Sequence, residues 1–179
     1  MGSGKYHYHY VLIFIYQSYR FNNNPCNCLL GWVNGVFTKE IYQYYLTMKE
    51  TKDVINNFLI HLQSRDLEKV LDLFAEKVNW DVPGDTKHIK WLGKRHNKAE
   101  IEEFYKLLWK ETEPISAEIH NILIENECAI IKGSFNTKML KTGNLVSSIF
   151  FIQLTIQKGK IVEYTLLEDS YAVSQSVLE

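Results

Sequence analysis

The sequence predicts an α+β fold in which three N-terminal helices pack within a strongly curved antiparallel sheet. Apolar residues recur at helical spacing through residues 49–110, with one short strand between the helices. From residue 115 the apolar period changes to two, and three short polar turns divide the remainder into hairpins. Such a chain must wrap its sheet around the helices, which makes a cone with one open end.

The helices are predicted from their caps and apolar stripes. The first, over about residues 49–64, begins at a capping box formed by Thr47 and Glu50. Asp66 is placed to cap the second, over residues 67–75, and Asn97 to cap the third. The predicted strands cover residues 78–82, 115–125, 128–137, 146–157 and 160–168.

The short strand and the loop after it carry two of the four tryptophans. Val78, Trp80 and Val82 alternate with polar residues and so share one face of the strand. Pro83 ends the strand because proline has no amide hydrogen for the ladder. Trp91 stands in the polar loop that follows, where a large aromatic side chain is expected to bury against the core or a pocket mouth.

Composition limits the classes of function. A length of 179 residues with 46% hydrophobic content allows one domain of ordinary size plus some additional chain. The net charge of -1 gives no reason to expect nucleic acid or an anionic membrane as partner. No apolar run reaches the length of a membrane helix. The three cysteines are too few for a disulfide framework and fit a reducing compartment, so we expect a soluble, cytoplasmic protein.

No metal or cofactor site is predicted. The histidines at 88, 96 and 120 lack ligand spacing on one element. Gly84 and Gly93 stand alone and do not form a glycine-rich phosphate loop.

Residues 1–47 differ from residues 48–179, which we predict to be the folded domain. The first segment is rich in tyrosine and asparagine and poor in charge. It is either an accessory arm that packs on the domain or on a second subunit, or an extension with no folded role. The absence of sustained periodicity favours the extension.

Residues 49–177 resemble the SnoaL-like branch of the nuclear transport factor 2 superfamily. The resemblance is carried by the helix–strand–loop segment and the end of the last strand, namely Phe58-Leu59, Asp66-Leu67, Leu73 to Glu76, Trp80 to Gly84, Trp91 to Gly93, Ile101, Phe104-Tyr105, Gly159 to Val162 and Glu168-Asp169. It implies the cone-shaped NTF2-like fold. It does not fix a reaction, because the superfamily includes isomerases, cyclases, dehydratases, epoxide hydrolases and non-catalytic binding modules.

The resemblance also excludes one activity. Ketosteroid isomerases of this superfamily use an aspartate before the strand-ending proline, a tyrosine on the first helix and a second acid on a late strand. The matching positions here are Val82, Phe58 and the apolar pair Phe151-Ile152. These side chains cannot move a proton or stabilise an oxyanion.

Three residues remain as candidate acid or base groups. The resemblance implies that an acid on a late strand faces the pocket, and Glu168 and Asp169 end the last strand. Adjacent strand residues point to opposite faces, so only one of the two can lie in the pocket. A carboxylate in an apolar cone would have a raised pKa and could act as general acid or base. His120 is the third candidate, provided that it lies on the concave face.

Two functions stay open at this point. The chain is either a cofactor-free lyase, isomerase, cyclase or hydrolase acting on a small apolar organic molecule, or a module that binds a ligand or dimerises without catalysis. The expected walls of the pocket are Phe58, Trp80, Val82, Trp91, Phe104 and Trp109. A homodimer would form through the convex face of the sheet, where Ile149, Phe151, Ile161 and Leu167 are expected to be exposed.

Overall fold

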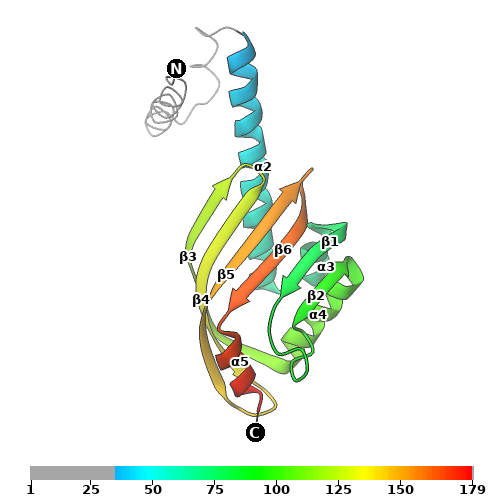
Figure 1. Cartoon of the computed structure of the whole chain (residues 1–179), viewed down its shortest axis with the longest axis vertical. Helices are drawn as coiled ribbons and strands as arrows, with labels where there is room; N and C mark the ends of the chain where they lie inside the picture. Colours follow the sequence, from blue (N-terminus) through cyan, green and yellow to red (C-terminus); the bar gives the residue numbers. More distant parts are fainter. Residues whose placement is uncertain (1–34, 179) are drawn as a thin grey trace, which may run out of the picture. The chain divides into compact units, whose positions relative to one another are not determined.

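The computed structural model describes residues 35–178 (Figure 1). The chain divides into a unit over residues 1–43 and a larger unit over residues 44–179. Of the first unit only residues 35–43 are described, as the start of helix α2 (Gly35–Ser64). The predicted start near Lys49 is therefore wrong, and Thr47 and Glu50 lie inside the helix. Most of the predicted extension, residues 1–34, lies outside the described residues.

The larger unit contains every other element. The helices are α3 (Leu67–Asp72), α4 (Lys98–Glu111) and α5 (Ser170–Ser176). The strands are β1 (Phe74–Val82), β2 (Gly93–Asn97), β3 (Thr112–Glu125), β4 (Cys128–Met139), β5 (Leu145–Gln157) and β6 (Lys160–Glu168). Within residues 35–178, no helix combines the length and apolar character that crossing a membrane requires.

Two of the predicted helix caps are confirmed. The Asp66 carboxylate accepts a hydrogen bond from the backbone N–H of Lys69 at 3.3 Å and starts α3. Asn97 accepts one from the backbone N–H of Glu100 at 3.0 Å, while the Glu100 carboxylate accepts one from the backbone N–H of His96 at 2.7 Å. This reciprocal arrangement satisfies amide groups that the first turn of α4 leaves unpaired.

The strands form one six-stranded sheet in the order β2-β1-β6-β5-β4-β3 (Figure 1). The last four strands form the predicted antiparallel meander, and β2 adds to β1 as a short edge strand. The pairing of β1 with β6 is parallel, which the sequence analysis did not foresee. This pairing places Trp80 beside Tyr164 and joins the helical half of the domain to its last strand.

Strand β5 alternates between a buried inner face and an exposed outer face, whereas the edge strand β3 is exposed along most of its length. Along β5, Phe150, Ile152 and Leu154 are buried while Ile149 and Phe151 are exposed. The helices complete the core on the inner side with buried residues from α2, α3 and α4, namely Val54, Ile55, Phe58, Val70, Ile101, Phe104 and Tyr105. This arrangement of helices within a curved sheet is the predicted NTF2-like fold.

Candidate functional site

The inner face of the sheet carries a cluster of aromatic side chains. Trp80 on β1 stacks on Tyr164 of β6, with ring centroids 3.8 Å apart and planes 9° from parallel. Phe104 and Tyr105 on α4 meet the same indole edge-on, at centroid distances of 4.8 and 6.0 Å. Phe58 on α2 closes the cluster against Tyr164 at 6.1 Å. Aromatic pairs of this kind stabilise a core beyond the area that they bury.

One carboxyl group lies at the edge of this cluster. Glu168 pairs across the sheet with Phe150, which is buried on the inner face, and stands four residues after Tyr164 on the same strand. Glu168 and Tyr164 thus share the inner face, because strand side chains alternate. The Phe150 ring occupies the space that a side chain at Gly133 would need.

Asp169 takes a different position. It caps helix α5, where its carboxylate accepts a hydrogen bond from the backbone N–H of Ala172 at 2.9 Å. It is exposed, and its backbone N–H donates to the Ser148 hydroxyl at 2.8 Å. Of the two neighbouring acids, Glu168 therefore shares the inner face with Tyr164 and Asp169 does not, and the placing of one of them in a pocket stays a prediction.

Burial changes the acidity of three groups inside the domain. Loss of hydration and, as the smaller cause, the neighbouring Asp169 charge together raise the pKa of Glu168 to about 7. Burial, followed by the Glu168 charge, also raises the pKa of Tyr164. The pKa of Tyr105 is raised by burial and then by Tyr164. Near neutral pH the two tyrosines are therefore neutral, and Glu168 is about half ionised.

Two buried donors in this cluster have no partner. The Trp80 Nε1 and Tyr105 Oη atoms form no hydrogen bond with any other residue in the described part of the chain. Trp80 is 0% exposed and Tyr105 is 3% exposed. A donor left unpaired in the interior costs stability, and structures contain few such groups.

Arg95, a buried arginine among the described residues, is bound to the backbone through its terminal nitrogens. Arg95 on β2 is 8% exposed and lies over the Phe104 ring, with its guanidinium carbon 5.6 Å from the ring centroid. Its terminal nitrogens donate to the backbone carbonyls of Lys90, Leu92, Gly93 and Lys94 at 3.3–3.4 Å. Burial lowers the pKa of this guanidinium. Its contacts fix the loop that leads into β2.

His120 lies on the outer face of the sheet. It occupies a bulge of β3, between Ile119 and Asn121, and its Nε2 is 3.1 Å from the hydroxyl of Ser134. Ser134 pairs with the exposed residue Ile149 of β5. The condition that His120 faces the concave side is therefore not met, and His120 does not reach the interior.

The predicted pocket walls belong to the packed core. Phe58, Trp80, Val82, Phe104 and Trp91 are all at most 8% exposed, and Trp109 is partly buried. Trp91 thus buries against the core, one of its two expected roles. Trp109 also stacks beneath Arg65, whose guanidinium carbon is 5.7 Å from the ring centroid.

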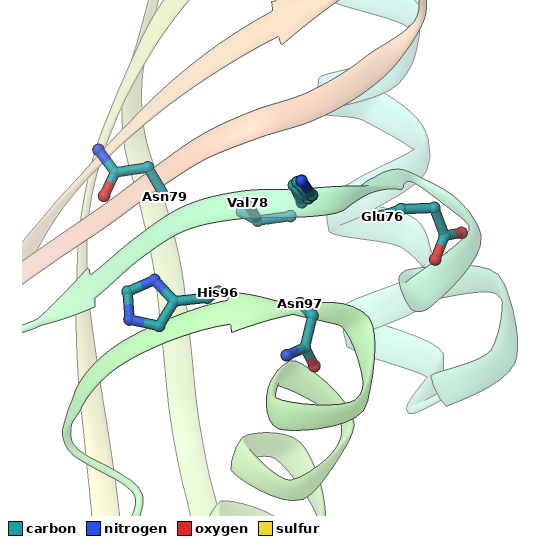
Figure 2. Close-up of a pocket in the computed structure, with 6 residues that line it drawn as sticks. Glu76, Val78, Asn79, His96 and Asn97 are labelled. Carbon is teal, nitrogen blue, oxygen red and sulfur yellow. The ribbon is translucent and has the colours of Figure 1, made fainter.

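An open cleft lies elsewhere, where β1 bulges away from β2. It has a volume of about 650 Å³ and is lined by Glu76, Lys77, Val78, Asn79, His96 and Asn97 (Figure 2). The Asn79 amide and the His96 ring extend from the two neighbouring strands in Figure 2. No residue predicted for the site lines this cleft. Among the described residues, no cluster of three or more potential metal ligands occurs.

Sequence reasoning missed several members of the interior cluster. It placed Tyr105 on the apolar face of its helix but gave its hydroxyl no role, and it did not single out Tyr164 or Phe150. The spacing of four residues between Tyr164 and Glu168 was available as a signal, because it predicts a shared face of a strand. The parallel partner of Tyr164 was not available, because β1 and β6 are far apart in the chain.

Comparison with known proteins identifies relatives of the domain. The family model described as SnoaL-like domain matches residues 55–164. No curated protein matches by sequence. An NTF2-like protein from Burkholderia xenovorans LB400 superimposes with a TM-score of 0.67 at 16% identity, covering 73% of this chain and 98% of that protein. An NTF2-like protein from Burkholderia thailandensis E264 gives 0.65 at 15% identity, with 72% and 98% covered.

A third similar structure has a small molecule in its description. TerC, co-crystallised with polyporic acid, superimposes with a TM-score of 0.63 at 17% identity, covering 72% of this chain and 98% of that one. At these identities the three structures share a fold with this domain, and the chemistry must be argued from the residues present here.

Proposed function

This chain belongs to the SnoaL-like domain family, and from that membership and its interior we propose that it handles a small, largely apolar organic molecule by acid–base chemistry at Glu168. The observation that carries the proposal is an inward-facing carboxyl group beside an aromatic cluster, with its pKa raised to about 7. A carboxyl group that is half ionised near neutral pH can both give and accept a proton.

The reaction class follows from what surrounds that carboxyl group. An uncharged, aromatic environment suits proton transfer to or from carbon or oxygen of an apolar molecule, as in a lyase, isomerase, cyclase or hydrolase. The aromatic cluster around Trp80 and Phe104 is packed core, so it supplies the low-polarity surroundings of that carboxyl group rather than a surface that the molecule contacts. Asp169 and His120 have no part in the proposed chemistry, since one caps α5 and the other lies on the outer face.

The experiment compares Glu168→Gln with Glu163→Gln. Glu163 lies on the same strand but faces solvent, so its variant controls for changed charge. Purified full-length protein is incubated in D₂O with a panel of enolisable ketones and epoxides. Polyporic acid is tested as one further compound. Deuterium uptake and diol formation are followed by mass spectrometry.

We expect turnover of at least one compound, with a rate that depends on pH around 7. Glu168→Gln should lower this rate by about 100-fold, in the range typical of a lost general acid or base. Glu163→Gln should leave it unchanged. A rate unaffected by Glu168→Gln, or the absence of turnover with every compound, would contradict the acid–base role.

The second candidate is a module that binds or dimerises without catalysis. The observation that favours it is the exposed apolar outer face of the sheet, where Ile149 is 56% exposed, Phe151 41% and Leu167 53%. We propose that this face forms a homodimer, which is compatible with either function. Ile161 does not belong to it, because a register shift after Thr155 turns Ile161 inward and buries it.

For location, we retain the cytoplasm as a proposal. It is supported by the sparse cysteines and by Cys128, which is a free thiol.

A further inference from the structure

Strand β3 forms one edge of the sheet and, among residues 35–178, pairs with a strand on one side only (Figure 1). It has 14 residues, and every residue from 113 to 123 is exposed. Because successive side chains of a strand point to opposite faces, this stretch is open on both faces as well as along its outer edge. Its apolar side chains include Ile119, which is 39% exposed, Ile122 at 38% and Leu123 at 66%. Such an edge offers a row of backbone N–H and C=O groups to another strand.

The opposite edge of the sheet, formed by β2, is better protected. Strand β2 has only five residues, and one of them is the charged, exposed Lys94. The backbone N–H of His96 on β2 donates to the Glu100 carboxylate at 2.7 Å, so this group is not free to pair with another strand. Short edge strands and charged side chains are common protections of a sheet edge. The two edges therefore differ in their capacity to accept a further strand.

The protection of β3 is local. Pro114 has no amide hydrogen, and register shifts next to Ile115 and His120 interrupt the ladder between β3 and β4. Residues 116–119 and 121–125 nevertheless pair with β4 in regular register. These two stretches contain no lysine or arginine and include three isoleucines and a leucine, residues that suit a strand. They are the part of the edge to which another strand can add.

The charge of β3 indicates what kind of strand would pair with it. Glu113, Glu118 and Glu125 lie on β3, and Lys138 of β4 stands opposite Glu113, whereas the β4 residues opposite Glu118 and Glu125 are uncharged. The Glu118 side chain is 79% exposed, and its carboxylate lies 3.9 Å from the ring of His120. Opposite charges that face each other across strands are favourable and like charges are unfavourable. A basic strand therefore fits this edge better than a second copy of the acidic β3.

We propose that the free edge of β3 is a docking site for an extended, basic peptide segment of a partner protein, which adds to the sheet as a further strand. Backbone hydrogen bonds along residues 116–125 would supply the affinity, and apolar side chains beside Ile119 and Ile122 would add contact. Lysine or arginine side chains near Glu118 and Glu125 would supply the selectivity. The inference does not depend on Glu168, and it leaves the outer face of β5 and β6 free for the proposed homodimer.

The experiment uses three short, fluorescently labelled peptides and the full-length protein. The first alternates valine with threonine and carries a lysine near each end. The second has glutamate in place of each lysine. The third keeps the lysines but is N-methylated at its central backbone amides, which removes hydrogen-bond donors without changing the charge. Binding is measured by fluorescence anisotropy, and amide hydrogen exchange followed by mass spectrometry locates the site.

Glu118→Lys is the variant that tests the role of charge. Glu163→Lys is its matched control, because Glu163 is also exposed but lies on β6, inside the sheet rather than at its edge. We expect Glu118→Lys to weaken binding of the basic peptide about fivefold, as expected for an exposed charge pair that becomes repulsive. Glu163→Lys should leave the affinity unchanged.

We expect the basic peptide to slow amide exchange within residues 116–125 and to bind at least about tenfold more tightly than the N-methylated peptide, since several backbone hydrogen bonds are lost. The acidic peptide should bind more weakly than the basic one. Equal binding of the N-methylated or acidic peptide, no binding of the basic peptide, or protection that appears outside β3 would overturn the inference. So would slow exchange of every amide in residues 116–125 before any peptide is added, because another part of the chain or a second copy would then already cover the edge.

Discussion

At the scale of single residues, Glu168 makes the domain sensitive to pH. Its pKa of about 7 in the folded state exceeds the ordinary value of 4.5. The folded state therefore holds a proton that the unfolded state has lost, and stability falls as pH rises from about 4.5 to about 7. The difference of roughly two and a half units corresponds to ~3 kcal/mol of unfolding free energy.

We therefore predict that Glu168→Gln removes this pH dependence. Relative to the wild type, the variant should gain stability between pH 4.5 and pH 8, by up to ~3 kcal/mol. Urea unfolding at a series of pH values measures the effect. Glu163→Gln, on the exposed face of the same strand, should follow the wild-type curve. Parallel curves for wild type and Glu168→Gln would mean that the carboxyl group titrates normally.

The inward position of Glu168 was only partly predictable. Strand alternation predicted that only one of Glu168 and Asp169 can lie in a pocket; in the structure Glu168 ends β6 on the inner face, and Asp169 lies beyond the strand and caps α5. Which of the two acids faces inward depends on the register of β6. The register shifts between the positions where β6 pairs with Thr155 and with Ile156, and this shift changes the alternation of side chains along the strand. The same shift explains the wrong prediction for Ile161. A bulge depends on contacts with neighbouring strands, and local periodicity does not reveal it.

At the scale of elements, helix α5 is held by hydrogen bonds on both sides. The Ser174 hydroxyl donates to the Asp85 carboxylate at 3.0 Å, and His88 Nδ1 lies 2.6 Å from the same oxygen. The Thr142 hydroxyl and the Asn144 amide donate to the Ser176 carbonyl at 2.7 and 3.1 Å. His88 and then Ser174 hold the pKa of Asp85 at about 2.

We predict that Ser174→Ala loosens α5 locally. One hydrogen bond of this kind contributes ~1 kcal/mol, so amide hydrogen exchange over residues 170–176 should speed up roughly fivefold. Gln175→Ala, on the exposed side of the same helix, should leave exchange unchanged. Exchange that is equal in both variants would show that Ser174 does not restrain α5.

Prediction succeeded where an element carries its own local signal. The caps at Asp66 and Asn97 and the bounds of β6 are local features, and the structure has them as expected. Strand β2 has only five residues, and α5 has seven, so neither shows a full apolar period. Phe74 lies at the start of β1 rather than in the preceding helix, because its pairing with Ile161 of β6 is a long-range contact.

At the scale of the whole molecule, the fold was predictable and the state of the site was not. Helical spacing followed by hairpins is enough to predict helices on a curved sheet. Whether Trp80 and Phe104 line an open space or fill it depends on how side chains from α2, α4, β1 and β6 meet. The stacking of Trp80 on Tyr164 joins residues 84 positions apart in the chain.

The outer face of the sheet leads to a prediction about assembly. Phe151 pairs with Leu167 across β5 and β6, and both are exposed. Leu123 and Ile130 form a second exposed apolar pair across β3 and β4, at 66% and 39%. Exposed apolar side chains gathered on one face favour association. A two-fold dimer would bury the same face on both copies.

We expect the wild type to sediment as a dimer and Phe151→Glu as a monomer in analytical ultracentrifugation. A charge placed at a buried apolar contact should weaken the dimer at least about 100-fold, because a dimer would bury it without a partner. Tyr171→Glu is the control, since it adds the same charge at an exposed aromatic residue on α5 rather than on the sheet. If the Phe151→Glu variant is still a dimer, the dimer uses another surface. If the wild type is a monomer at every concentration, the outer face does not form a homodimer and the proposal is wrong.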